Sequence, residues 1–221
     1  MAVTFRATTA RSATPAEPTG SAQDDIILAI ASTETGSPTI GVATGFTEID
    51  WGVEVEISGV TCRIYWARRG AGALATNWTG DYMIALIGYS GAKTSGSPIN
   101  ANAKSTLTGG SMSPYPSVTT TADNCMIVGL SGQWNWGATA PNAWANERYD
   151  PSSDIWIGDD GLFVTAGATG TIASTPSGSY GVLFTVAIEP DGGGGGGDPE
   201  MQVIRGGKLL HGGMLLKGIV R

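Results

Sequence analysis

The sequence predicts an all-β protein: an antiparallel, jelly-roll-like β-sandwich followed by a glycine linker and a C-terminal β-repeat tail. Three observations support this prediction. Apolar runs, either continuous or alternating with a period of two, recur between clusters of Gly, Ser, Pro and Asn. No capped apolar stretch with helical spacing extends beyond about ten residues. Six consecutive glycines at 192–197 separate the strand-rich region from a short repeat.

The strand-rich region contains about eight candidate strands. In the segment 61–68, alternation divides the side chains between two faces, Cys62, Ile64 and Trp66 on one and Arg63, Tyr65 and Ala67 on the other. Two packed sheets bury many short strands around one core, so a β-sandwich is the expected architecture. In chain order, the expected strands are 3–8, 25–32, 47–57, 61–68, 82–89, 125–130, 162–165 and 180–188.

The glycine run divides the chain into three parts. Residues 1–191 form the expected sandwich domain, called the body below. Residues 192–200 form the linker, because no packed element tolerates six glycines in a row. Residues 201–221 form a tail for anchoring or trimerisation.

The tail repeats a six-residue pattern: a basic residue, two glycines, a variable residue and two aliphatic residues. Six is a multiple of the strand period, so alternate leucines project to opposite sides. One copy is too short to bury its leucines, so the tail is expected to dock on another sheet or on copies of itself. A disordered terminus is the alternative. The anchoring residues are Arg205, Lys208, Leu209, Leu210, Leu215 and Leu216.

Charge and hydropathy exclude several classes of partner. The net charge of −7 combines 12 basic with 19 acidic residues, and such a surface repels nucleic acid. The body holds eight basic and 17 acidic residues, which leaves four and two for the rest, so the end of the chain is basic. No apolar run is long enough to span a membrane. The first ten residues lack a secretory signal, so cytoplasmic synthesis is expected.

The residues offer little basis for catalysis, and neither an enzyme nor a cofactor or metal site is expected. The single histidine, His211, occupies a repeat position in the tail, so a Ser-His-Asp triad has no base in the body. The acidic pairs 24–25, 54/56 and 159–160 are expected in turns or on the surface. The alternatives are a glycoside-cleaving pair, or Ca²⁺ at 159–160.

Two further features leave alternatives open. Cys62 and Cys125 both lie in apolar strand-like runs and are either two buried thiols or a bridge between strands. An aromatic segment of loop-like composition could pack on the core, form a subunit interface or contact a glycan. The residues of this candidate surface are Trp134, Trp136, Trp144 and Tyr149.

Four segments carry a family resemblance: Pro18–Ala31, Arg63–Arg69, Tyr82–Gly91 and Tyr180–Pro190. They resemble virion structural proteins of tailed bacteriophages, namely jelly-roll modules of head-decoration, minor-tail and tail-fibre type. The resemblance implies a non-catalytic virion component, often trimeric, whose partners are other capsid or tail proteins. The expected role is a capsid decoration or spike attached through the tail. The alternative is a tail-fibre or minor tail protein whose sandwich binds a host-surface glycan.

Overall fold

The structure is a computed structural model. It describes residues 1–34, 39–53, 59–107, 114–134, 144–149, 155–173 and 180–192, and the backbone of 203–204, 208–211 and 214–215. Only the backbone is described at Trp134 and Tyr149.

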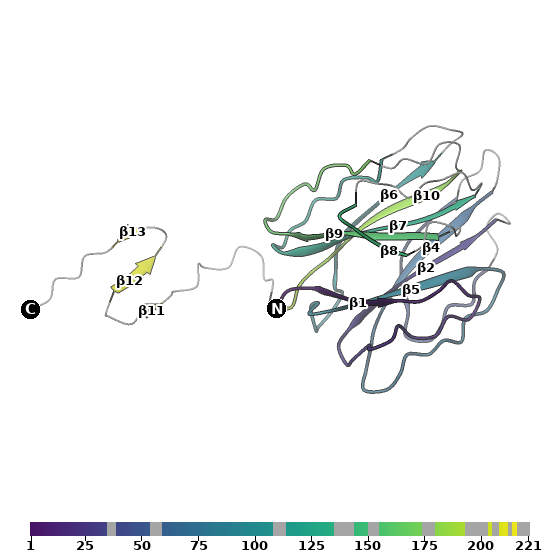
Figure 1. The fold of residues 1–221 in the computed structure, drawn as a ribbon, viewed down its shortest axis with the longest axis horizontal. Helices are drawn as coiled ribbons and strands as arrows, with labels where there is room; N and C mark the ends of the chain where they lie inside the picture. Colours follow the sequence, from purple (N-terminus) through teal and green to yellow (C-terminus); the bar gives the residue numbers. More distant parts are fainter. Residues whose placement is uncertain are drawn as a thin grey trace, which may run out of the picture.

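Ten strands of the body form two five-stranded antiparallel sheets, which pack face to face (Figure 1). Sheet I has the order β1-β5-β2-β4-β3, and sheet II has the order β6-β10-β7-β9-β8. The strands of sheet I are β1 (Thr4–Thr8), β2 (Ile26–Thr33), β3 (Thr47–Val53), β4 (Thr61–Arg68) and β5 (Met83–Ser90). The strands of sheet II are β6 (Ile99–Leu107), β7 (Cys125–Trp134), β8 (Asn146–Tyr149), β9 (Ile155–Phe163) and β10 (Tyr180–Ile188).

The predicted all-β sandwich is confirmed, but the strand order is not that of a jelly roll. A jelly roll passes repeatedly between its two sheets. This chain completes sheet I before it enters sheet II through residues 91–98. Apolar alternation predicts which face of a strand is buried and contains no information on which strands are neighbours, so the sequence could not fix this connectivity.

Most predicted strands are present, and two were missed. Segment 61–68 is β4 as expected, with Cys62 and Ile64 in the core between the sheets and Tyr65 on the opposite face. β6 and β8 were not expected, and β9 begins at Ile155, seven residues earlier than predicted. β6 is an edge strand whose alternating, more buried positions are mostly Ala and Ser, which are weak signals of a strand.

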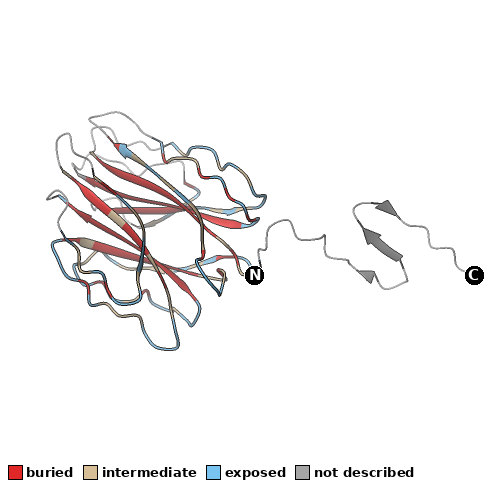
Figure 2. Cartoon of the chain, turned by 180° about the vertical axis from the view of Figure 1, so that it is seen from behind, coloured by how far each residue is buried: buried red, intermediate tan, exposed pale blue. Residues whose placement is uncertain are grey.

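The main core lies between the two sheets, where the central strands are almost completely buried (Figure 2). At its centre lie β2 and β7, whose inward side chains face one another. These are Ile26, Leu28 and Ile30 from β2 and Met126, Val128 and Leu130 from β7.

Long loops cover the outer faces of both sheets. On sheet I, Ala43, Trp78 and Tyr82 pack over the outward residues of β2, β4 and β5. On sheet II, Tyr115 and Trp144 pack over outward residues of β7, β9 and β10. Burial on both faces explains why β2 is apolar at almost every position.

Three short tail strands pair with one another. β11 (Val203–Ile204), β12 (Lys208–His211) and β13 (Met214–Leu215) have the order β11-β12-β13, and the register places Leu210 opposite Leu215. Of the expected linker 192–200, residues 193–200 lie outside the described residues, as do the anchoring candidates Arg205 and Leu216. Within the described parts of the chain, no helix is long and apolar enough to cross a membrane.

Candidate functional site

The structure places Trp144 in a buried aromatic cluster on the outer face of sheet II. Its indole is 7% exposed and lies 5.0 Å from the Tyr115 ring and 5.9 Å from Trp156, centroid to centroid. Two glycines make room for the indoles. A Cβ at Gly129 would lie 2.2 Å from Trp144 Cζ2, and one at Gly158 would lie 2.2 Å from Trp156 Cη2. Trp144 is therefore packed within the fold, on the outer face of sheet II and outside the core between the sheets.

The other residues of that segment are less fully placed. Trp134 ends β7 and pairs with Tyr180, and Tyr149 ends β8 and pairs with Ile157. Trp136 lies outside the described residues.

Trp51 on β3 is the large aromatic residue that the described surface exposes, with 43% of its side chain accessible. It is paired with Arg63 on β4, whose guanidinium lies 5.1 Å from the indole centroid, and Lys104 Nζ of β6 lies 6.0 Å from it. An indole among paired charges can contact a sugar ring or a partner side chain. Sequence reasoning assigned Trp51 to a strand and did not recognise its exposure. We call this set the Trp51 rim: Glu48, Asp50, Trp51, Arg63, Asn102 and Lys104.

Ion pairs hold the Trp51 rim together. Arg63 Nη1 donates to Glu48 Oε2 at 2.9 Å, and Lys104 Nζ donates to Asp50 Oδ1 at 2.8 Å. Side chains also cap the outer backbone of β3. Lys104 Nζ donates to the Trp51 carbonyl at 2.6 Å, and the Trp51 amide donates to Asp50 Oδ1 at 2.8 Å. These contacts orient the indole and remove backbone groups that an added strand would need.

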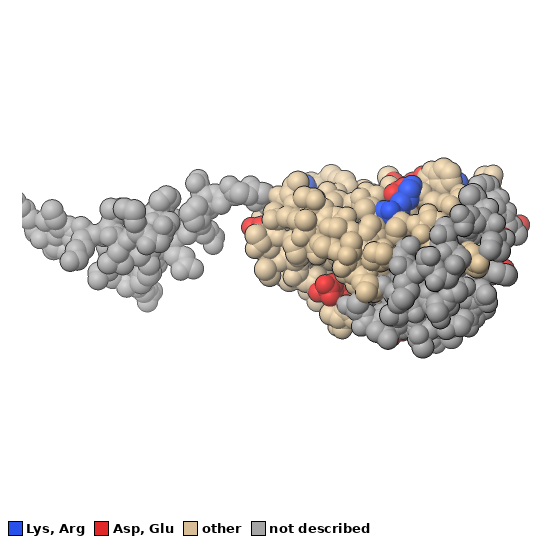
Figure 3. All heavy atoms as spheres, turned by 90° about the horizontal axis from the view of Figure 1, so that it is seen from above, with Lys and Arg blue, Asp and Glu red and all other residues tan. Residues whose placement is uncertain are grey.

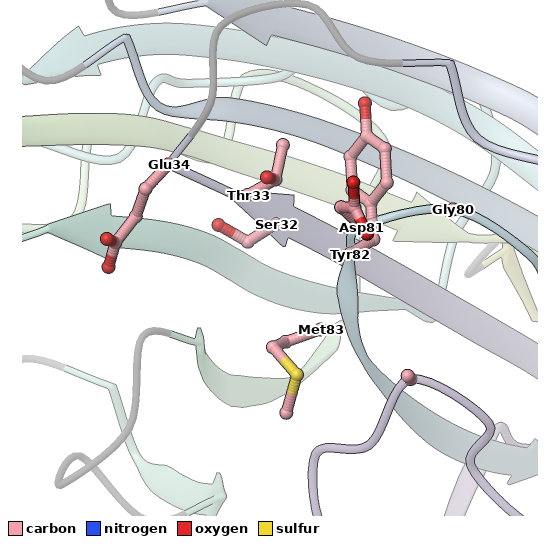
Figure 4. Close-up of a pocket in the computed structure, with 8 residues that line it drawn as sticks. Ser32, Thr33, Glu34, Gly80, Asp81, Tyr82 and Met83 are labelled. Carbon is pink, nitrogen blue, oxygen red and sulfur yellow. The ribbon is translucent and has the colours of Figure 1, made fainter.

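A second candidate is a hollow of about 380 Å³ between the end of β2 and the start of β5 (Figure 4). Glu34 stands at one side and Tyr82 at the other, with Ser32 and Thr33 between them. Its volume is typical of a small-ligand site. Its polar groups are mainly carboxylates and hydroxyls, which can hydrogen-bond a small polar molecule. The lining residues are Ala13, Ser32, Thr33, Glu34, Gly80, Asp81, Tyr82 and Met83.

Asp159 forms a buried ion cluster, so its expected place in a surface turn is wrong. It lies within β9, is 0% exposed, and accepts hydrogen bonds from Arg148 Nε at 2.6 Å and Arg148 Nη2 at 3.2 Å. Asn146 Nδ2 donates to it at 2.8 Å and the Tyr89 hydroxyl at 3.3 Å. Both carboxylate oxygens are occupied, and the neighbouring Asp160 is exposed. The cluster joins β5 of sheet I to β8 and β9 of sheet II.

The remaining groups considered for chemistry are dispersed or buried. Cys62 and Cys125 are free and buried, and desolvation raises the pKa of Cys62 to about 12 and that of Cys125 to about 11. Neither thiol is therefore a nucleophile near neutral pH. Asp25 is buried and paired with Arg6 at 3.2 Å. Among the residues that the structure describes, no three His, Cys, Asp or Glu side chains are grouped to hold a metal ion.

Among the described residues, charged side chains are sparse on the face of the body drawn in Figure 3. Comparisons with protein-family models, with curated proteins and with solved structures found no match for this chain.

Proposed function

We propose that the chain is a non-enzymatic structural protein of a bacteriophage virion. In this proposal the body is displayed on the particle as a capsid decoration or spike. The tail fixes it there, or holds copies of the chain together as a trimer.

The observation that carries the proposal is that the body is hydrogen-bonded back on itself at Asp191, directly before the glycine run. The Asp191 amide donates to the Gly91 carbonyl at 2.8 Å, and Thr94 Oγ1 donates to Asp191 Oδ1 at 3.1 Å. The Met1 nitrogen donates to the Asp191 carbonyl at 2.5 Å. These bonds join the two ends of the body, which supports a separate role in attachment for the glycine run and the tail.

Charge also supports attachment through the tail. The residues after the glycine run hold four basic and two acidic side chains, in contrast to the acidic body. A basic, leucine-containing strand segment fits an acidic, apolar groove on a particle, and opposite charges speed the encounter.

Truncation tests this function. Deleting residues 198–221 should leave a body that unfolds cooperatively at an unchanged temperature but no longer joins particles of the encoding phage. Sedimentation should show the full chain as an oligomer and the truncated chain as a monomer. A matched variant with Leu209, Leu210, Leu215 and Leu216 changed to Ser keeps the length and charge and should behave like the truncation. Normal incorporation of either variant would contradict the role of the tail.

A second candidate function is receptor binding through a host-surface glycan, and the exposed Trp51 favours it. If the sandwich binds sugars, Trp51→Ala should abolish glycan-array binding without changing the unfolding temperature. Val164→Ala is a suitable control because Val164 is also exposed, at 69%, and lies directly after β9 of the other sheet. Equal binding by the wild type and Trp51→Ala would exclude the Trp51 rim as the sugar site.

A further inference from the structure

The two sheets have the same strand order when five is added to each strand number. Sheet I is β1-β5-β2-β4-β3, and sheet II is β6-β10-β7-β9-β8. Every pairing within sheet I thus has a counterpart in sheet II, and all of them are antiparallel. Five strands can be ordered in a sheet in many ways, so identical order in consecutive halves of one chain requires an explanation.

The outer strands β1 and β6 share an irregularity at the same place. In sheet I the extra residue is Arg6, which follows Phe5, the partner of Tyr89. In sheet II the extra residue is Asn100, which follows Ile99, the partner of Ile188. Tyr89 and Ile188 are themselves counterparts, because they pair with the first inward residues of β2 and β7.

The opposite outer strands, β3 and β8, share a second irregularity. In sheet I the extra residue is Ile49, which precedes Asp50, the partner of Ile64. In sheet II the extra residue is Arg148, which precedes Tyr149, the partner of Ile157. Bulges are specific features that are retained within families, so two coincident pairs are strong support for a common origin. A further shift between β7 and β9 has no counterpart in sheet I.

The entry to the central strand is also the same in both halves. The structure has two positive-φ residues other than glycine among those described, Asp24 at 68° and Asn124 at 58°. They lie at corresponding positions, 100 residues apart, just before β2 and β7. Asp and Asn are the residues that tolerate this conformation best after glycine. Adding 100 to the residue numbers of the inward side chains of β2 gives the residue numbers of the inward side chains of β7.

One contact relates the two halves to each other symmetrically. Ala92 bridges to Pro190, and the Asp191 amide donates to the Gly91 carbonyl. In the correspondence set by Tyr89 and Ile188, Gly91 matches Pro190 and Ala92 matches Asp191. Exchanging the halves therefore maps the Ala92–Pro190 pair onto the Asp191–Gly91 pair, and both pairs are in contact.

We propose that residues 1–92 and 97–191 are two copies of one five-stranded unit, and that the inner face of each unit is a dimerisation surface for a second copy of that unit. The sandwich is then a fused dimer, and residues 93–96 are the connection that joined its subunits. The main core is the former interface.

Divergence between the copies predicts unequal self-association. Two first units would bring together Phe5 and Tyr89 of one with Ile49 and Trp66 of the other, which are largely apolar. Two second units would place Asp159 opposite Ile188 in place of Tyr89, so the carboxylate would lose a hydrogen-bond donor. The first unit should therefore form the more stable homodimer.

A cleavable chain tests the proposal. A protease site inserted at exposed residues 94–97 of the full chain should give two fragments that stay together after cleavage and separate in urea. The first fragment has no tail, so its self-association reports on the inner face alone. After removal of urea it should sediment at twice its mass, show near-ultraviolet circular dichroism, and be displaced by the second fragment. A monomeric first fragment at about 100-fold the concentration that restores the mixed pair would overturn the proposal.

The control cleavage is at exposed Gly72, inside the first unit, and fragment 1–71 should not form such a dimer. Because an isolated unit can aggregate, a circular permutant gives an independent measurement. It begins at Ser97, joins Asp191 to Met1 through a short linker, and ends at Gly96. If the two junctions are equivalent, it should unfold cooperatively within about 5 °C of the body. An unfolded permutant would contradict the equivalence.

Discussion

The two open edges of the sandwich occupy corresponding places in the two halves, and they are closed in different ways. Where β1 meets β8, Arg148 and Asp159 form a buried ion cluster beneath Phe5. Where β6 meets β3, the matching positions are Ile49 and Trp66, which pack against the main core. The same backbone register thus accepts either a charged pair or an apolar pair.

The two edges differ in whether their charged side chains are buried or face the solvent. The buried charges of Arg148 and Asp159 need hydrogen-bond partners from the side chains around them. This requirement restricts the positions of those side chains and so fixes the geometry of the edge. At the other edge the core is closed by apolar groups, and the charges of the Trp51 rim remain outside, where they surround an exposed indole. The charged groups where β1 meets β8 stabilise the fold, whereas those where β3 meets β6 are exposed and can contact a partner.

The largest effect is expected from removing the buried carboxylate. Asp159→Ala leaves the Arg148 guanidinium, the Asn146 amide and the Tyr89 hydroxyl without their acceptor, and should lower the free energy of unfolding by about 3–5 kcal/mol. Urea denaturation measures this loss. The control is Asp160→Ala at the exposed neighbouring position, which should change stability by less than about 0.5 kcal/mol. Similar effects at both positions would show that the cluster does not close this edge.

The outer faces provide the next comparison. Gly129→Ala places a methyl group against the Trp144 indole, and should lower stability by about 1–3 kcal/mol through overpacking. At the corresponding position of β2, Ala29 already has a methyl group, and Ala29→Gly should lower stability by about 0.5–1 kcal/mol. Thermal unfolding followed by tryptophan fluorescence measures both. A neutral Gly129→Ala would indicate that Trp144 is not seated on β7.

Alkaline pH tests the burial of Cys62 between the sheets. Burial disfavours the thiolate and raises the pKa of this thiol from its ordinary value of 9.0 to about 12 in the folded chain. The unfolded chain therefore loses this proton first, and stability present below pH 9 falls as pH rises toward 12, by up to about 1.4 kcal/mol per pH unit. Burial raises the pKa of Tyr89 in the same direction. Cys62→Ala should show a shallower decline than the wild type, and equal slopes would contradict this assignment.

The smallest effect is expected at the Trp51 rim. Lys104→Met removes an exposed ion pair with Asp50 and should change stability by less than about 1 kcal/mol. A double-mutant cycle with Asp50→Asn isolates the pair, and its coupling should decrease in high salt. A coupling as large as the effect of Asp159→Ala would mean that the two edges are closed in the same manner.

The sequence was sufficient for features that depend on local alternation. It predicted β4 and the division of Cys62 and Tyr65 between opposite faces, because a period of two determines these directly. It did not predict that Asp159 would be buried, because Tyr89 of β5 is 70 residues away and the other partners lie on β8, a strand that was not expected. The Asp-Asp-Gly pattern indicated a turn, and tertiary pairing overrode that local preference.

The equivalence of the two halves was hidden for a related reason. The inward residues of β2 are Ile26, Leu28 and Ile30, and those of β7 are Met126, Val128 and Leu130. All six are apolar, but no position retains the same residue, and cores tolerate such exchanges when volume and pattern are kept. Strand order and register reveal the correspondence because backbone geometry is retained after side chains have changed.

The capped outer strand β3 has a consequence for crowding. Where many copies of this body are held side by side, a bare strand edge would invite a neighbour to add its own strand and begin a continuous sheet. Lys104 and Asp50 occupy the backbone groups of Trp51 on which such growth would begin. Copies held close together at this edge can therefore avoid pairing their β3 strands into a continuous sheet.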